Sequence, residues 1–253
     1  MTAADSATDF ATSPATDFVA DFATDPAVAP AAVDWYFDPI SPFSYLAFER
    51  LPQVLPAATR VRYVPVLFAG LLRHWGNVGP AEIPPKRRFT FEHVAWIAHR
   101  DEVPLAMPAA HPFNPLPLLR LAVALELEGR LSRETLAPLL HFVWRHGHVP
   151  QRQAEFAVLC GALGVPAAAL AREPVKARLR EHGDEAVARG VFGVPTAVLP
   201  GDPAGQLFWG LDALDMLAAR LRRDPFFASD AFRAAGELPP GEGRADAPKP
   251  AGP

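Results

Sequence analysis

The chain has 253 residues, half of them apolar, with a formal net charge of -4 and one cysteine. This length can bury one sizeable core, the weak charge argues against a general nucleic-acid binder, and no apolar stretch reaches the roughly 20 residues that a membrane span needs. The single cysteine, Cys160, excludes an intramolecular disulfide, a Cys-x-x-Cys redox pair and a cysteine-rich zinc site, so we expect no metal.

Both ends of the chain have a biased composition. Residues 1–32 repeat a Thr-Asp-Phe unit and contain no Lys or Arg, which fits neither a secretory signal nor a mitochondrial transit peptide. We expect 1–32 to be a disordered acidic low-complexity arm, and 234–253, rich in Pro, Gly and charge, to be a disordered tail. A cytoplasmic location is then the default expectation.

The first elements of the folded part are a strand, a helix and a second strand. The apolar run 33–37 predicts a buried strand, and a turn at 38–40 leads into a helix over 42–51. Alternating polar and apolar side chains over 60–66 predict the second strand. The stretch 68–88, rich in Gly and Pro, is expected to consist mainly of loop.

A long helical block precedes a second group of short strands. Two short apolar runs at 196–199 and 205–209 predict a β-hairpin, followed by a helix over 212–223. We therefore expect an α/β, thioredoxin-like fold with a large all-helical insertion, in which 33–67 and 190–233 form the thioredoxin-like domain and 68–189 the insertion. The predicted helices of the block are 89–101, 115–128, 132–146, 154–163 and 166–189, the last with a break.

A Ser-Pro pair stands where the first helix begins. Ser41 is a natural N-cap and Pro42 a natural first helical residue. A helix N-terminus favours an anion and lowers the pKa of a thiol there, yet the chain offers only the hydroxyls of Ser41 and Ser44. Such a hydroxyl can donate to the thiolate of another molecule, of which glutathione is the simplest candidate. Two alternatives stay open: Ser41 only caps the helix, or it is a nucleophile, although no nucleophile elbow is recognisable.

Two further segments fit a peptide-binding edge. A cis bond between Val194 and Pro195 would free the N–H and C=O of Val194 to pair with an extended peptide such as glutathione; the alternative is an ordinary turn. Near the last helix, Asp212 could cap that helix or bind the ammonium of a γ-glutamyl group.

These motifs occur in an order that resembles one family. The chain resembles 2-hydroxychromene-2-carboxylate isomerases, which are related to kappa-class glutathione transferases and to disulfide oxidoreductases with a helical insertion. The resemblance covers about residues 33–217 and implies a glutathione-dependent cis–trans isomerisation of an aromatic acid by reversible thiolate addition to a conjugated double bond. The segments that carry it are 37–47, 76–82, 111–114, 188–196 and 208–210.

The resemblance also assigns roles to residues. It makes Ser41 the catalytic residue that contacts the glutathione sulfur, and it implies a homodimer; the charge and the apolar stretches described above predict no nucleic-acid or membrane partner. Lys86, with Arg87 and Arg88, could bind the substrate carboxylate, or form a solvated basic patch. Besides Ser41, the glutathione-binding positions are Val194, Pro195, Trp209, Gly210, Leu211 and Asp212, and the substrate-binding positions are Glu82, Ile83, Lys86 and His111.

Two other functions stay open at this stage. A kappa-like glutathione transferase would use the same Ser41 site to form stable conjugates with electrophiles. A non-catalytic binding protein is suggested by Leu211 and Ala213, because the family commonly carries Asn or Gln at the first position and arginine at the second. The cysteine count excludes a disulfide oxidoreductase.

Overall fold

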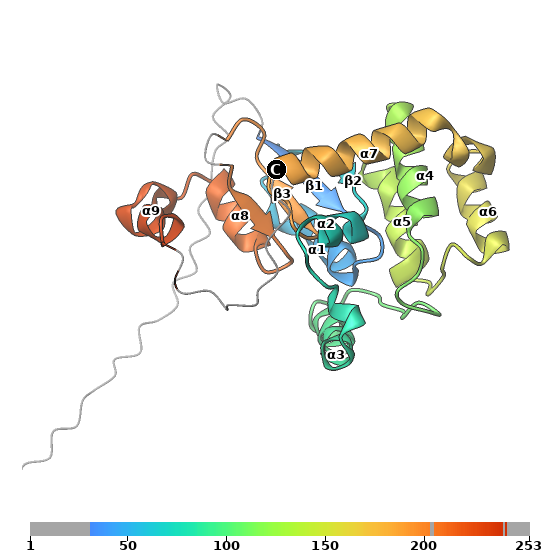
Figure 1. Ribbon diagram of the computed structural model, residues 1–253, viewed down its shortest axis with the longest axis horizontal. Coiled ribbons are helices and arrows are strands. Elements are labelled where there is room, and N and C mark those ends of the chain that lie inside the picture. The colour runs from blue at the N-terminus through green and yellow to red at the C-terminus, as the bar shows by residue number, and fades with distance from the viewer. Residues whose placement is uncertain (1–30, 203–204, 240, 242–253) are drawn as a thin grey trace, which may run out of the picture.

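The computed structural model describes residues 31–202, 205–239 and 241, and its centre is a four-stranded mixed sheet (Figure 1). The strand order is β2-β1-β3-β4; β1 runs parallel to β2, and β3 is antiparallel to both β1 and β4. The adjacent antiparallel β3 and β4 confirm the predicted hairpin. The strands are β1 (Ala32–Phe37), β2 (Arg60–Pro65), β3 (Thr196–Val198) and β4 (Leu207–Trp209).

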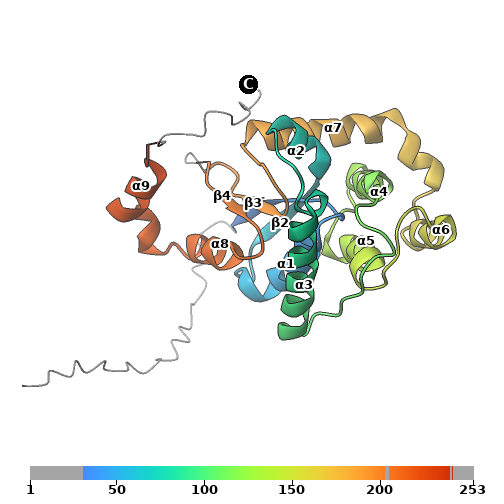
Figure 2. The ribbon, with the colours of Figure 1, turned by 60° about the horizontal axis from the view of Figure 1, so that its bottom comes forward.

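Helices cover both faces of this sheet and form a block at one of its ends (Figure 2). In that view α2 and α7 lie on one side of the sheet, and α1 and α8 on the other. The α-helices are α1 (Pro42–Val54), α2 (Phe68–His74), α3 (Pro84–Arg100), α4 (Leu116–Leu127), α5 (Arg133–Trp144), α6 (Gln153–Ala162), α7 (Glu173–Ala188), α8 (Leu214–Leu221) and α9 (Asp230–Gly236). None of the helices within the described ranges is long and apolar enough to cross a membrane.

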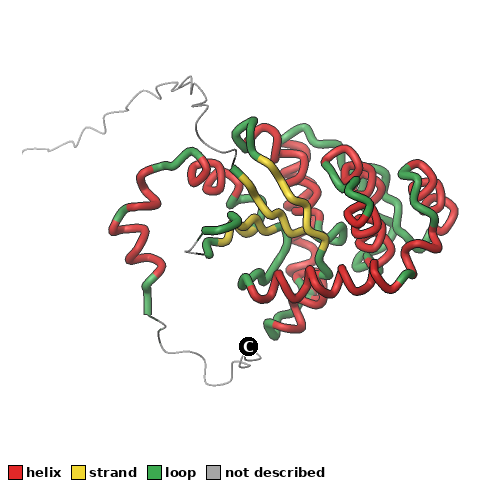
Figure 3. The backbone as a smooth tube through the Cα atoms, turned by 90° about the horizontal axis from the view of Figure 1, so that it is seen from above, coloured by secondary structure: helices red, strands yellow, loops and turns green. Residues whose placement is uncertain are grey.

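The alternation of side chains along β1 separates two hydrophobic clusters. Trp35 and Phe37 point into the cluster that includes α1 and α8, whereas Tyr36 points into the cluster that includes α2 and α7. The first cluster continues into buried residues of α3, α4, α5 and α6. Figure 3 shows the strands at the centre and most of the insertion helices gathered at one end. The first of the two clusters therefore joins one face of the sheet to the insertion.

The expected loop at 68–88 is wrong in part, because α2 and the start of α3 lie within it. The α2 helix has seven residues and no side-chain cap of its own, so a tertiary contact has to support it. That contact is the N–H of Phe68, which donates to the buried carboxyl of Asp38 at 2.9 Å. The helix propensities of these residues cannot predict a hydrogen bond to a residue 30 positions away, so the sequence does not reveal α2.

Other boundaries follow local signals more closely. The predicted break in 166–189 is confirmed, since a 3₁₀ turn (Ala167–Ala171) precedes α7. At the C-terminal end, α9 extends to Gly236, into the tail expected from residue 234. Ser229 starts this helix by accepting from the N–H of Phe232 at 3.2 Å. The expected arm 1–32 lies outside the described residues except for its last two positions.

Candidate active site

The turn between β1 and α1 places Ser41 at the N-terminus of α1. The N–H of Ser44 donates to Ser41 Oγ at 3.3 Å, so Ser41 is the N-cap that the sequence predicts. Pro42 has no N–H, and the N–H of Phe43 has no acceptor among the described residues. The positive end of α1 therefore presents one unpaired backbone donor beside the Ser41 hydroxyl.

Ser41 meets Val194 across the fold. Ser41 Oγ donates to the carbonyl oxygen of Val194 at 3.4 Å, and both residues are buried. The bond between Val194 and Pro195 is cis, which confirms that prediction. The expectation that both backbone groups of Val194 are free is half right: the carbonyl accepts from Ser41, while the N–H has no acceptor within the described residues.

The segment after β4 lies against the same edge. The N–H of Gly210 donates to the carbonyl of Pro195 at 2.8 Å, and the ring of Trp209 packs on Phe192 at 4.9 Å between centroids. A Cβ on Gly193 would lie 2.4 Å from Trp209 Nε1, so only glycine allows this close approach. Trp209 itself stays 52% exposed. The structure thus brings Trp209 and Gly210 to the predicted peptide-binding edge.

Asp212 and Leu211 differ in what they offer to a ligand. The N-cap of α8 is Ala213 and no side chain caps it, so the interpretation of Asp212 as a helix cap is wrong. The Asp212 carboxylate is exposed and lies close to Gly210, where it is accessible to a cation. The Leu211 side chain is buried in the core, which leaves only its backbone for ligand contact.

A buried carboxyl, Asp38, holds the turn that carries Ser41. Asp38 Oδ1 accepts from the N–H of Ile40 and Oδ2 from the N–H of Phe68, both at 2.9 Å. Complete burial raises its pKa to about 7, although both N–H groups favour the ionised form. The sequence marks Asp38 only as a turn residue, and no local signal reveals that it also anchors α2.

Two side chains of the insertion hold the same turn from the other side. Trp144 Nε1 donates to the carbonyl of Pro39 at 2.8 Å, and His111 Nε2 lies 3.0 Å from the carbonyl of Ile40. A carbonyl can only accept, so Nε2 carries the proton of His111. Burial lowers the pKa of His111, which keeps the ring neutral at pH 7. His111, predicted to contact substrate, thus also positions the Ser41 turn.

The other predicted substrate residues lie on or before α3. Glu82 Oε1 accepts from the N–H of Gly79 at 2.8 Å, Ile83 is the half-buried N-cap of α3, and Lys86 is exposed. Within the described residues none of the three forms a hydrogen bond with the Ser41 turn. Arg87 does reach this region, because its guanidinium donates to the carbonyl of His111.

Cys160 does not belong to this site. It is a buried residue of α6, and burial raises the pKa of its thiol. A neutral buried thiol behaves as a small hydrophobic side chain. The thiol chemistry that the Ser41 turn could support therefore needs a sulfur from another molecule.

The Trp144 hydrogen bond can be tested separately from ring packing. We expect Trp144→Phe to lower the free energy of unfolding by about 1–3 kcal/mol, because the carbonyl of Pro39 then stays buried without its donor. Urea denaturation measures this change. Trp96→Phe is the control, since Trp96 is 55% exposed and should change stability by less than about 0.5 kcal/mol. Equal effects of the two substitutions would contradict the role assigned to Trp144.

Comparison with known proteins places the fold in a family. Residues 32–222 match the DsbA-like thioredoxin domain. The chain belongs to this family, which confirms the thioredoxin-like fold with a helical insertion.

Within the family, the relatives include isomerases and glutathione transferases. The chain is 32% identical over 197 residues to 2-hydroxychromene-2-carboxylate isomerase of Sphingobium xenophagum, an alignment that covers 75% of this chain and 97% of the relative. It is 26% identical to glutathione S-transferase kappa 1 of Rattus norvegicus, over 75% and 90% of the two chains. A solved 2-hydroxychromene-2-carboxylate isomerase superposes with a TM-score of 0.65 at 26% identity, over 83% of this chain and 100% of that one.

Proposed function

We propose that this protein is a glutathione-dependent isomerase of aromatic acids of the 2-hydroxychromene-2-carboxylate type. The observation that carries the proposal is the Ser41 hydroxyl at the N-terminus of α1, within reach of Val194 from a distant part of the chain. Relatives with the name of this isomerase support the reaction class. The chain provides no thiol at this turn, so the sulfur has to come from a bound molecule.

The residues present fit a peptide thiol such as glutathione. When bound, glutathione would supply a nucleophilic thiol that adds reversibly to a conjugated double bond and so permits rotation. The Ser41 hydroxyl and the N–H of Phe43 are the donors next to the sulfur position, and the field of α1 lowers the pKa of a thiol there. At 3.4 Å the bond from Ser41 to Val194 is long, so its proton can turn to an anion at little cost.

The rest of the peptide would lie along the edge formed by the cis bond. The N–H of Val194 is available for pairing, the turn at Pro195 and Gly210 closes the edge, and Trp209 offers an exposed ring. Backbone groups of Leu211 and the carboxylate of Asp212 would hold the γ-glutamyl end, the carboxylate by pairing with its ammonium.

We assign the aromatic acid to the side of the turn that faces the insertion. His111 is fixed there by Ile40 and presents a neutral ring, and Lys86 provides a cation without an ion-pair partner among the described residues. Glu82 and Ile83 would border this substrate position at the start of α3. A homodimer and a cytoplasmic location complete the proposal.

The deciding experiment measures isomerisation of 2-hydroxychromene-2-carboxylate to trans-o-hydroxybenzylidenepyruvate by absorbance, with and without glutathione. We expect turnover only with glutathione, and S-methylglutathione should not replace it because it has no ionisable thiol. Equal rates with and without the thiol would contradict the proposal.

A kappa-like glutathione transferase is the second candidate, favoured by relatives with that name. Mass spectrometry of the reaction with an electrophile distinguishes the two, because a transferase consumes glutathione and accumulates a conjugate. A binding protein without catalysis is the third candidate, suggested by Leu211 and Ala213, and calorimetry that shows no glutathione binding at millimolar concentration would favour it.

A further inference from the structure

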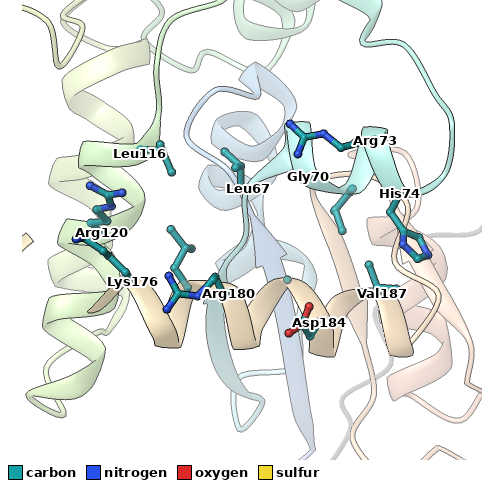
Figure 4. A pocket seen from close by; sticks show the side chains of 13 residues that line it. Leu67, Gly70, Arg73, His74, Leu116, Arg120, Lys176, Arg180, Asp184 and Val187 are labelled. Carbon is teal, nitrogen blue, oxygen red and sulfur yellow. The ribbon is translucent and has the colours of Figure 1, made fainter. Parts of the chain in front are cut away.

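A pocket of about 520 Å³ lies between α2, α4 and α7, and none of the residues assigned above to the active site lines it (Figure 4). Its volume is in the range of small-molecule sites. Aliphatic side chains from all three helices and from the loop before α2 form much of its wall. These are Leu67, Leu71, Leu116, Leu179 and Val187.

Basic side chains from three helices surround this apolar wall. Arg73 comes from α2, Arg120 from α4, and Lys176 and Arg180 from α7, while Asp184 is the acidic residue of the lining. Figure 4 shows Arg120 and Lys176 where α4 meets α7, with Arg73 on the α2 side. A hollow of this kind has a positive potential that attracts anions.

The basic groups are only partly neutralised by the protein. Lys176 and Arg180 both pair with Glu173, the first at 3.9 Å and the second by a hydrogen bond. Arg73 and Arg120 have no acidic partner among the described residues, and Arg120 Nε is buried there without an acceptor. With no acidic partner, the guanidinium of Arg120 can pair with a carboxylate bound in the pocket through the N–H groups that line it.

Two glycines leave room in the pocket for an apolar group. Gly70 on α2 and Gly183 on α7 both line it, and a Cβ built on either would meet no atom within 4 Å. Space next to the aliphatic wall accommodates a hydrophobic body, while Arg120 holds an acidic end. Inorganic phosphate alone would leave this wall without contacts.

We propose that this pocket binds an organic acid with an apolar body and a carboxylate, at a site separate from Ser41. The carboxylate pairs with Arg120, and the body lies against the aliphatic wall near Gly183. This site is independent of the reaction proposed for Ser41, since it uses different residues on α2, α4 and α7.

Calorimetric titration of the full chain with 1-naphthoate tests the proposal. We expect saturable binding below about 10 mM that weakens as salt is raised. The neutral 1-naphthamide and inorganic phosphate should each bind at least about tenfold more weakly. No saturable binding, or equal affinity for either of these probes, would overturn the proposed chemistry.

Matched variants locate the ligand. Gly183→Leu fills the pocket and should weaken 1-naphthoate binding at least about tenfold. Gly161→Leu is the control, because Gly161 also has open space around its Cβ but lies on α6 away from the lining. Arg120→Gln should weaken binding similarly, whereas Arg152→Gln, an exposed cation of the segment before α6, should not. Binding that survives Gly183→Leu and is lost in Ser41→Ala would place the ligand at the active site and refute a separate one.

Discussion

We expect Ser41→Ala to lower kcat for the glutathione-dependent isomerisation at least tenfold. A hydrogen bond to a charged group contributes about 1.5–3 kcal/mol, and each 1.4 kcal/mol corresponds to about a factor of ten in rate. The substitution also removes the side-chain cap of the Ser44 N–H, which keeps the carbonyl of Ser41 as an acceptor at 3.1 Å, so we expect a stability cost of at most about 1 kcal/mol. Steady-state kinetics at saturating glutathione, together with a urea denaturation curve, separates the loss of rate from the loss of fold.

Ser229→Ala is the matched control for this experiment. Ser229 caps α9 with the same kind of bond, to the N–H of Phe232 at 3.2 Å, but it belongs to a different part of the fold. We expect Ser229→Ala to lower the free energy of unfolding, because the helix α9 loses its side-chain cap, and to leave kcat unchanged. If Ser41→Ala leaves the turnover number unchanged, Ser41 is a structural cap and the proposed mechanism is wrong.

The second large effect is on stability, through Asp38. We expect Asp38→Ala to lower the free energy of unfolding by about 2–6 kcal/mol, because the N–H groups of Ile40 and Phe68 each lose their acceptor at about 1–3 kcal/mol. Asp38→Asn keeps one acceptor oxygen, so it should cost less. Chemical denaturation followed by circular dichroism measures both variants.

The same carboxyl makes stability depend on pH with a definite sign. Its folded pKa of about 7 is above the unfolded value near 3.8, so between these limits the folded state binds more protons than the unfolded state. The free energy of unfolding contributed by Asp38 therefore falls as pH rises from about 4 to 7 and is constant outside this window. Asp38→Asn has no titrating group at this position, so the difference in the free energy of unfolding between the two proteins should vary with pH across this window. A difference that does not vary with pH would show that Asp38 keeps an ordinary pKa.

Local signals in the sequence were sufficient for the elements that carry the proposed chemistry. The hydroxyl of Ser41 and the ring of Pro42 favour the start of a helix at α1. The cis bond before Pro195 concerns a single dipeptide, Val194-Pro195. The hairpin of β3 and β4 follows from two short apolar runs around a turn. Each of these features depends on neighbours in the chain.

The supporting contacts could not be predicted because they join distant residues. The helix α2 depends on Asp38, 30 positions earlier, and Trp144 reaches Pro39 from 105 positions away. In the sequence, Asp38 looks like an ordinary turn residue and Trp144 like an ordinary core residue. Asp212 was also ambiguous, because capping and ligand binding need the same carboxylate, and only the position of Ala213 at the start of α8 decides against the cap.

The contact between Ser41 and Val194 has a consequence for synthesis of the protein on the ribosome. The two residues are 153 positions apart, and the entire insertion is translated between them. A nascent chain that already contains α1 through α7 still lacks the strand edge opposite the serine. The contact between Ser41 and Val194 can therefore form only after nearly the whole folded part has left the exit tunnel.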